Sequence, residues 1–496
     1  MTSPGCRTSF WTFRQRSRTC PTASTCSPTR ARSRIRRRTR NGSKSPSSAM
    51  PTRQTTDGFR PISTARASVS RLTESFSFLR GNVLVLTVSG CLGMFSRNMV
   101  FPYIPLYILT LGGDPAEIGI VYALGPLGGL LVFPVAGYLA DYVSRARLIA
   151  FTGYFSSAVI LINAVAPSWE WVAAARLLQG FAVTHFPASS AILADSLPPE
   201  KRGKGLATMA ALSGALALFA PWVAGSMLDT HGVETGMRYL YVAMAIAYAL
   251  GATINLLFLR ETRPPQAEPI RIDNLTQTLR SSYAGIPDLL RGFPTALRAM
   301  SIIIILCFIA NGIASPFWVV YAKTHIGLSS SQWGLILLVE VALRNLTTIP
   351  AGFITDRYGR SPFILGALVA TVVIPLFLFA EGFVHVLLIR CAVGVIAAFF
   401  SPTMGALLAD LVPSSTRGRV MAAIGRGSVM IGGASGGVGG PGTGFLITVP
   451  LMLASVAGGL LYEWNPLAPW IVVFAVSLIS VATAAFYLRD PEKPER

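Results

Sequence analysis

From about residue 82 onward, the chain alternates long apolar segments with short polar loops. Twelve of these segments are long enough to cross ~30 Å of hydrocarbon as helices. They lie at about 82–111, 116–140, 148–167, 171–194, 205–228, 238–259, 299–322, 332–353, 362–380, 383–407, 444–462 and 468–487. The pattern predicts an all-α membrane protein with twelve transmembrane helices. The longest connection, 260–298, joins the first six segments to the last six.

Two phrases in the polar loops occur twice at a fixed distance. GYLADYVSRAR at 137–147 returns as GFITDRYGR at 352–360, and ADSLPPEKRGK at 194–204 returns as ADLVPSSTRGR at 409–419. Both pairs keep a step of 215 residues, which is far longer than the unit of a solenoid repeat. The chain therefore consists of two homologous halves. We expect two pseudo-symmetric six-helix bundles with a substrate site between them, as in transporters.

The composition agrees with a membrane protein. Hydrophobic residues make up 52% of the chain and charged residues 13%, with a mean hydropathy of +0.54. A soluble domain usually carries about a quarter charged residues. The six cysteines and four histidines are scattered, and neither metal-binding spacings nor a nucleotide-binding GxxxxGK[ST] motif occurs. We therefore expect no enzyme activity, no metal and no cofactor, and transport that does not use ATP directly.

The net charge of +20 is concentrated at the N-terminus, where the first 80 residues hold 17 Lys or Arg but only Asp57 and Glu74. Such a segment cannot bury a core and is predicted to be a disordered basic tail. It has three interpretations: an organelle transit peptide, a segment that contacts anionic lipid, or a leader that is not native because translation starts at Met50. It lacks the interleaved aromatic residues of a nucleic-acid-binding module, so we expect no nucleic-acid partner.

The loop charges predict the orientation of the protein in the bilayer. With a cytoplasmic N-terminus, the inner loops hold most of the Lys and Arg, whereas the outer loops and their edges hold only Arg238 and Lys323. This distribution obeys the positive-inside rule. We expect a multi-pass protein of the cell membrane with both termini in the cytoplasm.

One segment breaks the symmetry of the halves. Asp229 and Glu463 occupy matching places but lie 234 residues apart, and the glycine-rich stretch 432–444 lies between the second pair of loops and span 11. Because glycine disfavours helix, we expect a flexible or re-entrant segment there.

GYLADYVSRAR and GFITDRYGR resemble the G-x-x-x-D-R-x-G-R loop signature of the Major Facilitator Superfamily, and the resemblance covers roughly 82–487. The first copy departs from it at Tyr142 and Ser144. In this family the loop charges latch the inner gate together with an acid at the end of span 4 or 10. The alternative is that they only fix topology. The resemblance implies gating roles for Asp141, Arg145, Asp195, Arg202, Asp356, Arg357, Arg360, Asp410 and Arg417.

The same resemblance extends to span 4, where RLLQG (176–180) is similar to an R-x-x-Q-G element found in many proton-coupled members. Arg390, in RCAVG (390–394), is the counterpart of Arg176 at an offset of 214. An arginine in hydrocarbon costs roughly 2.5–3.5 kcal/mol on insertion scales, so it faces a cavity or a partner. Snorkelling to the nearby outer surface is the alternative for Arg176.

Further polar residues lie in the middle of apolar spans. Arg97 in span 1 aligns with Asn311 in span 7, and the family places both spans at the central cavity. Glu340 and Arg344 lie in span 8 at the i,i+4 spacing, so they either neutralise each other or form a titrating carboxylate tuned by Arg344 or Arg97. His185 in span 4 is a candidate for a proton path or a structural residue. We predict that these residues, with Arg176, line the substrate and proton pathway.

These observations predict five parts: a tail at 1–80, a bundle at 81–260, a linker at 261–298, a second bundle at 299–489 and a short tail at 490–496. The predicted function is proton-coupled efflux of a small organic molecule by a monomer in the lipid bilayer. In span 5, Pro221 and Gly225 match a drug-antiporter motif that is otherwise degraded. The alternatives are proton-coupled metabolite uptake, or a non-transporting membrane sensor or scaffold. Arg97 favours an anionic substrate.

A chain shortened to begin at Met50 should insert into the membrane and transport at the rate of the full chain, because the removed residues cannot join the bundle. Membrane fractionation and a transport assay measure this. Loss of insertion in the shortened chain would contradict the interpretation of the tail.

Overall fold

The computed structural model describes residues 79–199, 202–263, 293–412, 420, 423–425, 431–432 and 444–490. Within these ranges all regular structure is helical, and twelve spans are long and apolar enough to cross a membrane. The predicted number and order of spans are therefore confirmed. The basic tail up to residue 78, most of the central linker and residues 433–443 lie outside the described residues.

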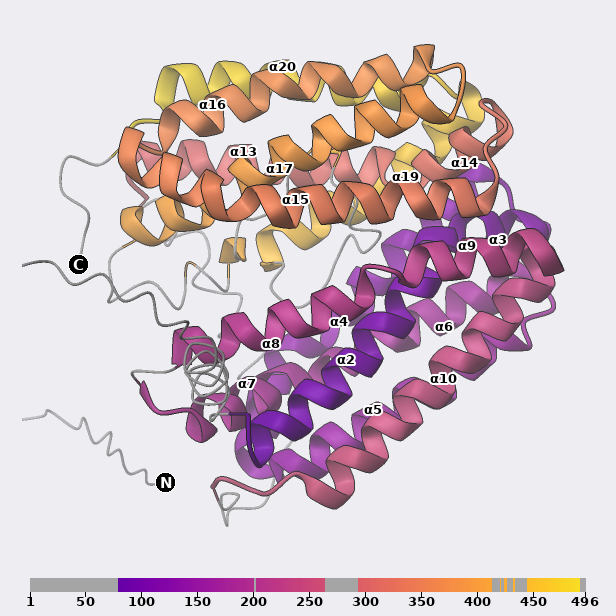
Figure 1. Cartoon of the computed structure of the whole chain (residues 1–496), viewed down its shortest axis with the longest axis vertical. Helices are drawn as coiled ribbons and strands as arrows, with labels where there is room; N and C mark the ends of the chain where they lie inside the picture. The colour runs from indigo at the N-terminus through magenta and orange to yellow at the C-terminus, as the bar shows by residue number, and fades with distance from the viewer. Residues whose placement is uncertain are drawn as a thin grey trace, which may run out of the picture. The chain divides into compact units, whose positions relative to one another are not determined.

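The first half contains six spans (Figure 1). Spans 1, 4 and 5 are each built from consecutive helices, and spans 2, 3 and 6 are single helices. They are α2 (Asn82–Val100), η1 (Phe101–Tyr103) and α3 (Ile104–Thr110); α4 (Pro115–Tyr142); α5 (Arg145–Ala164); α6 (Trp169–Phe181), η2 (Ala182–Thr184) and α7 (His185–Ser196); α8 (Arg202–Ala217) and α9 (Ala220–His231); and α10 (Val233–Phe258).

The second half repeats this order. Its spans are α13 (Thr295–Ala314) with α14 (Phe317–Thr324); α15 (Ser330–Tyr358); α16 (Ser361–Ala370) with η4 (Thr371–Phe379); α17 (Phe383–Leu411); α19 (Phe445–Trp464); and α20 (Ala468–Tyr487). Pro102 lies in η1 and Pro316 lies between α13 and α14, so the first span of each half is broken at the same place. Proline removes an N–H donor and clashes with the preceding turn, which explains both breaks.

The second span of each half begins with the same local device. Asp114 caps α4 in a capping box with Glu117, whose carboxylate accepts the Asp114 N–H at 2.7 Å. Ser329 caps α15 with Gln332 in the same way, at 2.9 Å. Both positions of the box recur at the step of 215, although the residues differ, and each box satisfies N–H groups that the first helical turn leaves without partners. The repeat therefore preserves helix starts as well as loop motifs.

Among the described residues, the halves contact each other mainly through α15 with α9 and α4 with α19, with a smaller contact of α14 with α3. Small residues allow the contact of α15 with α9. A Cβ added at Gly225 would lie 2.2 Å from the Ser330 carbonyl oxygen, and one at Gly334 would lie 2.4 Å from that of Pro221. The two backbones therefore approach too closely for any residue but glycine.

Hydrogen bonds reinforce this contact. The Asp229 carboxylate accepts the N–H groups of Ser330 and Ser331 at 2.8 Å each, at the first turn of α15. The Tyr103 hydroxyl lies 2.7 Å from the carbonyl oxygen of Pro221 and 3.0 Å from that of Ser330, so it joins α9 to α15. We call this end of the bundles, which carries Asp229 and the two capping boxes, the acidic end. The end that carries Arg145 and Arg360 is the signature end.

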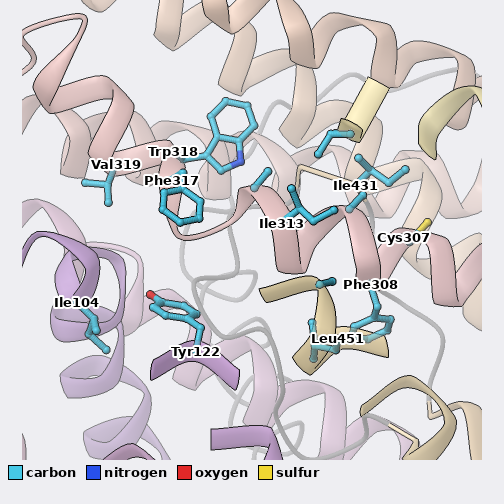
Figure 2. Close-up of a cluster of buried hydrophobic side chains, with 14 of the residues drawn as sticks. Ile104, Tyr122, Cys307, Phe308, Ile313, Phe317, Trp318, Val319, Ile431 and Leu451 are labelled. Atoms are coloured by element: carbon cyan, nitrogen blue, oxygen red, sulfur yellow. The ribbon is translucent and has the colours of Figure 1, made fainter. Parts of the chain in front are cut away.

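The apolar core and the outer surface suit a protein solvated by lipid. Side chains from both halves join one buried cluster, in which Figure 2 shows Ile104 and Tyr122 from the first half and Phe317 and Trp318 from the second. Large apolar side chains such as Phe353 and Phe379 are 75% and 78% exposed. A soluble protein avoids exposing many such groups, whereas hydrocarbon accepts them at no cost.

Asp229→Ala should weaken closure of the acidic end, because it removes two charge-assisted hydrogen bonds to the start of α15. A loss of ~1.4 kcal/mol would lower the closed population relative to the open one about tenfold. Spin-label distances between α9 and α15 measure this population. Asp114→Ala is the matched control, because Asp114 caps a helix of its own half. An unchanged distance distribution in Asp229→Ala would contradict the latch.

Candidate functional site

A buried ion pair lies in the second half. The Glu340 Oε2 atom accepts the Nη2 and Nε groups of Arg390 at 2.6 and 2.8 Å, and each residue is 1% exposed. Arg390 also donates through Nη1 to the Gly432 carbonyl oxygen at 3.0 Å. Its guanidinium carbon lies 4.5 Å from the ring centre of Trp318 and 5.8 Å from that of Trp333. The charges are thus enclosed by aromatic rings and protein dipoles.

The pair forms because α15 and α17 cross closely. A Cβ added at Gly394, one turn beyond Arg390, would lie 2.9 Å from the Glu340 carbonyl oxygen. Glycine at this position therefore lets the two helix backbones approach until carboxylate and guanidinium meet. Removing one partner of a buried pair typically costs about 3–5 kcal/mol, because it leaves an uncompensated charge. The pair is consequently a strong constraint on the packing of spans 8 and 10.

The structure changes the predicted partner of Glu340. The sequence spacing placed Arg344 beside it, but the ion pair is with Arg390, from a different helix. Arg344 lies one turn further along α15 and is only partly buried. Helical spacing brings two side chains near each other, yet Arg390 has a better geometry because it donates two hydrogen bonds to one carboxylate oxygen.

The first half holds a second group of buried cations. Arg176, on α6, is 7% exposed, and its guanidinium carbon lies 4.9 Å from the ring centre of Phe101 and 5.4 Å from that of Tyr122. The guanidinium carbon of Arg97, on α2, lies 4.5 Å from the same Phe101 ring. Within the described part of the chain, neither arginine has a hydrogen bond or an ion pair, and the Nε atom of Arg176 is buried without an acceptor. Two cations therefore share one aromatic ring.

The remaining predicted pathway residues have local partners. Asn311 is buried on α13 and donates to the Cys307 carbonyl oxygen at 2.8 Å, one turn earlier. The Nδ1 atom of His185, at the start of α7, lies 2.6 Å from the Ala182 carbonyl oxygen, and its ring lies against Phe186. These contacts suit residues that stabilise helix turns. They do not bring either residue to one of the two arginine groups.

At the signature end, the described loop residues form one ion pair in the first half and two in the second. Arg145 bonds Asp195 at 3.2 Å, and Arg360 bonds Asp410, the repeat partner of Asp195. Arg360 also lies 3.6 Å from Asp356. Arg202, the other gating candidate of this loop, donates through Nε to the backbone carbonyls of Ala194 and Leu197.

Of the three further gating candidates, the structure describes the side chain of one. Arg357 is exposed on α15 and lies over the Tyr358 ring at 5.6 Å. The Asp141 side chain and all of Arg417 lie outside the described residues.

Sequence reasoning missed two acids, one in each half, that hydrogen-bond the start of the third span. Glu261, after span 6, accepts the Ser144 hydroxyl at 2.7 Å and the Ala146 N–H at 3.3 Å, at the start of α5. Asp490, after span 12, accepts the N–H groups of Arg360 and Ser361 at 3.0 Å, at the start of α16. The signal was present as Leu-Arg followed by an acid at 259–261 and again at 488–490.

Within the described residues, no three His, Cys, Asp or Glu side chains are grouped as a metal site would require. The charged groups are instead arginines and single carboxylates on facing helices. Such groups can bind anions, exchange protons and form or break ion pairs.

Two related helical bundles that meet at one end and carry buried charges on facing helices define a secondary membrane transporter. Comparison with protein families agrees. The model described as Major Facilitator Superfamily matches residues 86–299 and again 300–496. The chain belongs to this superfamily.

Curated relatives include multidrug exporters. The chain is 26% identical over 350 residues to the "Multi-drug resistance efflux pump PmrA homolog" of Lactococcus lactis, covering 68% of this chain and 82% of that protein. It is 25% identical over 303 residues to the "Multidrug resistance protein MdtG" of Enterobacter lignolyticus, covering 59% of this chain and 68% of that protein.

Solved structures share the fold. A mutant form of the nucleoside transporter NupG has a TM-score of 0.60 at 17% identity, and a bacterial ferroportin homologue in an inward-facing state has 0.61 at 14%. Both comparisons cover 82% of this chain and 98% of the solved chain. At these identities the likeness concerns the fold alone.

Glu340→Gln should lower the unfolding temperature in detergent, because it leaves Arg390 unpaired at a cost of about 3–5 kcal/mol. Adding Arg390→Gln should restore most of the loss, whereas adding Arg344→Gln should not. A thermal unfolding series on the purified variants measures this. Equal recovery in both double variants would contradict the assignment of Arg390 as the partner.

Proposed function

We propose that the protein exports small organic molecules from the cell in exchange for protons. Its multi-pass membrane architecture and superfamily membership support a transporter of small molecules, and the relatives named as efflux pumps support export. The positive loops at the signature end support placing that end, and both termini, in the cytoplasm. Contact between the halves at the acidic end then corresponds to a state that is closed outside and open inside.

The Glu340–Arg390 pair is the observation that carries the proposal of proton coupling. Buried carboxylates in membrane spans commonly mark proton relays. Protonation of Glu340 neutralises one partner and leaves Arg390 with the Gly432 carbonyl and the Trp318 ring as its remaining contacts. The packing of α15 against α17 then has two arrangements, one for each charge state. A conformational equilibrium can be driven by such a difference in interaction free energy.

Gating in this proposal uses the two ends in alternation. The Asp229 and Tyr103 contacts hold the acidic end closed while the signature end is open. The pairs of Arg145 with Asp195 and Arg360 with Asp410 lie within their halves in this state. When the halves rock, the same charged loops are available to close the signature end. A monomer suffices for this cycle because each chain holds both bundles.

Proton-coupled uptake is the alternative within the same mechanism. The solved nucleoside transporter NupG shares this fold, and so does the D-xylose–proton symporter, with a TM-score of 0.59. At identities of 17% and 15%, these structures support the fold but not the direction of transport. A non-transporting scaffold has no use for an ion pair enclosed in the membrane spans, so this class gains no support from the site.

Proteoliposomes with an imposed pH gradient test the function. The full chain should accumulate at least one member of a panel of neutral, cationic and anionic aromatic compounds only while the gradient lasts, and a pH-sensitive dye should record coupled proton movement. No gradient-dependent movement of any compound would contradict proton-coupled transport. The sidedness of accumulation separates export from uptake.

The double variant Glu340→Gln with Arg390→Gln should keep exchange of substrate across the membrane but lose gradient-driven accumulation at least tenfold. The double change removes the carboxylate that binds the proton. It also removes the arginine, so no unpaired charge is left in the membrane span. Counterflow and accumulation assays measure the two activities, and the control is Glu381→Gln, an exposed acid at the start of α17. Full gradient-driven accumulation in the double variant would rule out this pair as the coupling site.

A further inference from the structure

We propose that Arg176 and Arg97 form a binding site for the carboxylate group of an aromatic organic acid, and that this acid is a transported substrate. The proposal rests on the transport function proposed above and adds the chemical class of the substrate. It follows from a comparison of the two halves of this chain, in which one arginine has a protein carboxylate and its counterpart does not.

The two arginines occupy equivalent places. Arg176 and Gly180 on α6 correspond to Arg390 and Gly394 on α17 at the step of 214. A Cβ added at Gly394 would meet the Glu340 carbonyl oxygen at 2.9 Å, and one added at Gly180 would meet the Gly125 carbonyl oxygen at 2.6 Å. The same helix crossing is therefore built twice, and Gly125 stands where the second half has Glu340. The first half keeps the guanidinium but lacks the carboxylate.

The acids that the structure describes in the first half do not supply the missing carboxylate. Among its described acids, those outside the linker lie at the ends of spans: Asp114, Glu117, Glu170, Asp195, Asp229 and Glu234. Arg176 and Arg97 lie within electrostatic range of each other and contact the same Phe101 ring. Two like charges held together in a low-dielectric region favour binding of an anion between or beside them.

Gly125 does not have its lack of a side chain imposed by helix packing. A Cβ added at Gly125 would meet only the Arg176 carbonyl oxygen, at 3.9 Å, which is an ordinary contact. By contrast, a Cβ at Gly128, on the same face of α4, would lie 2.4 Å from the Leu177 carbonyl oxygen. Gly128 is thus required for helix packing, whereas Gly125 leaves room for a side chain that this chain does not have.

The surrounding side chains indicate the rest of the ligand. A guanidinium presents parallel N–H donors that match the two oxygens of a carboxylate. Phe101 and Tyr122 lie against Arg176, and Tyr248 lies within electrostatic range of Arg97. Aromatic walls beside two guanidinium groups suit a planar apolar body that carries one negative charge.

Binding of 2-naphthoate and of its neutral analogue 2-naphthamide to the purified full-length chain, measured by titration calorimetry, tests the site. The wild-type chain should bind the carboxylate at least tenfold more tightly than the amide, because a charge-assisted pair replaces a neutral contact. Arg176→Gln should remove this preference. Equal affinities of the wild-type chain for the two compounds would overturn the proposal.

Gly125→Glu provides the sharpest variant, since it rebuilds in the first half the acid that the second half has. It should weaken binding of 2-naphthoate at least tenfold while leaving binding of 2-naphthamide within about twofold, whereas the matched variant Gly125→Gln should keep the preference for the carboxylate. Equal binding of 2-naphthoate by the Glu and Gln variants would overturn the proposal. Because Arg176→Gln tests the same contact, the result does not depend on the folding of one variant.

Transport separates this inference from the function on which it rests. In phosphatidylcholine proteoliposomes, whose headgroups carry no net negative charge, a pH gradient should move 2-naphthoate in the wild-type chain but not in Gly125→Glu. Movement of only neutral or cationic compounds would overturn the substrate class and leave proton-coupled transport intact. Binding of 2-naphthoate without gradient-dependent movement of any compound would keep the site but contradict the function.

Discussion

The cost of placing charge in hydrocarbon is the constraint on which the rest of this structure depends. The two buried arginines of equivalent position have protein contacts: Arg390 has a carboxylate and two aromatic rings, and Arg176 has two aromatic rings. These contacts require helices to cross closely, and glycines at the crossings make close approach possible. The same glycine positions therefore determine both how the helices pack and where the buried charges lie.

The sequence was sufficient for the fold because hydrophobic length and the internal repeat are properties of the chain itself. Twelve apolar segments predicted twelve helices, and the fixed step of 215 predicted two related bundles. Span ends shifted by a few residues where capping governs them. Asp114 and Ser329, for example, set the starts of α4 and α15 through local hydrogen bonds that hydropathy does not register.

Partners were harder to predict than positions. Glu340 and Arg344 lie one turn apart in the sequence, yet the carboxylate bonds Arg390, 50 residues further along. Which arginine comes closest to Glu340 depends on how α15 and α17 cross at Gly394. This crossing involves two helices, so it cannot be predicted from the sequence of either helix alone. The same holds for Asp195, which binds Arg145 from the preceding loop and not the nearer Arg202. Local spacing therefore identifies charged residues but not their ion pairs.

The carboxylates of Glu261 and Asp490 each link two spans of one half, which bears on how the halves move. Each acid follows the sixth span of its half and accepts a backbone N–H at the start of the third span. The third and sixth spans are therefore joined within one half, without a contact from the other half. A half joined in this way resists internal deformation. We therefore expect the halves to move as two bundles that rotate about the contacts of α15 with α9 and of α4 with α19, with little bending within either bundle.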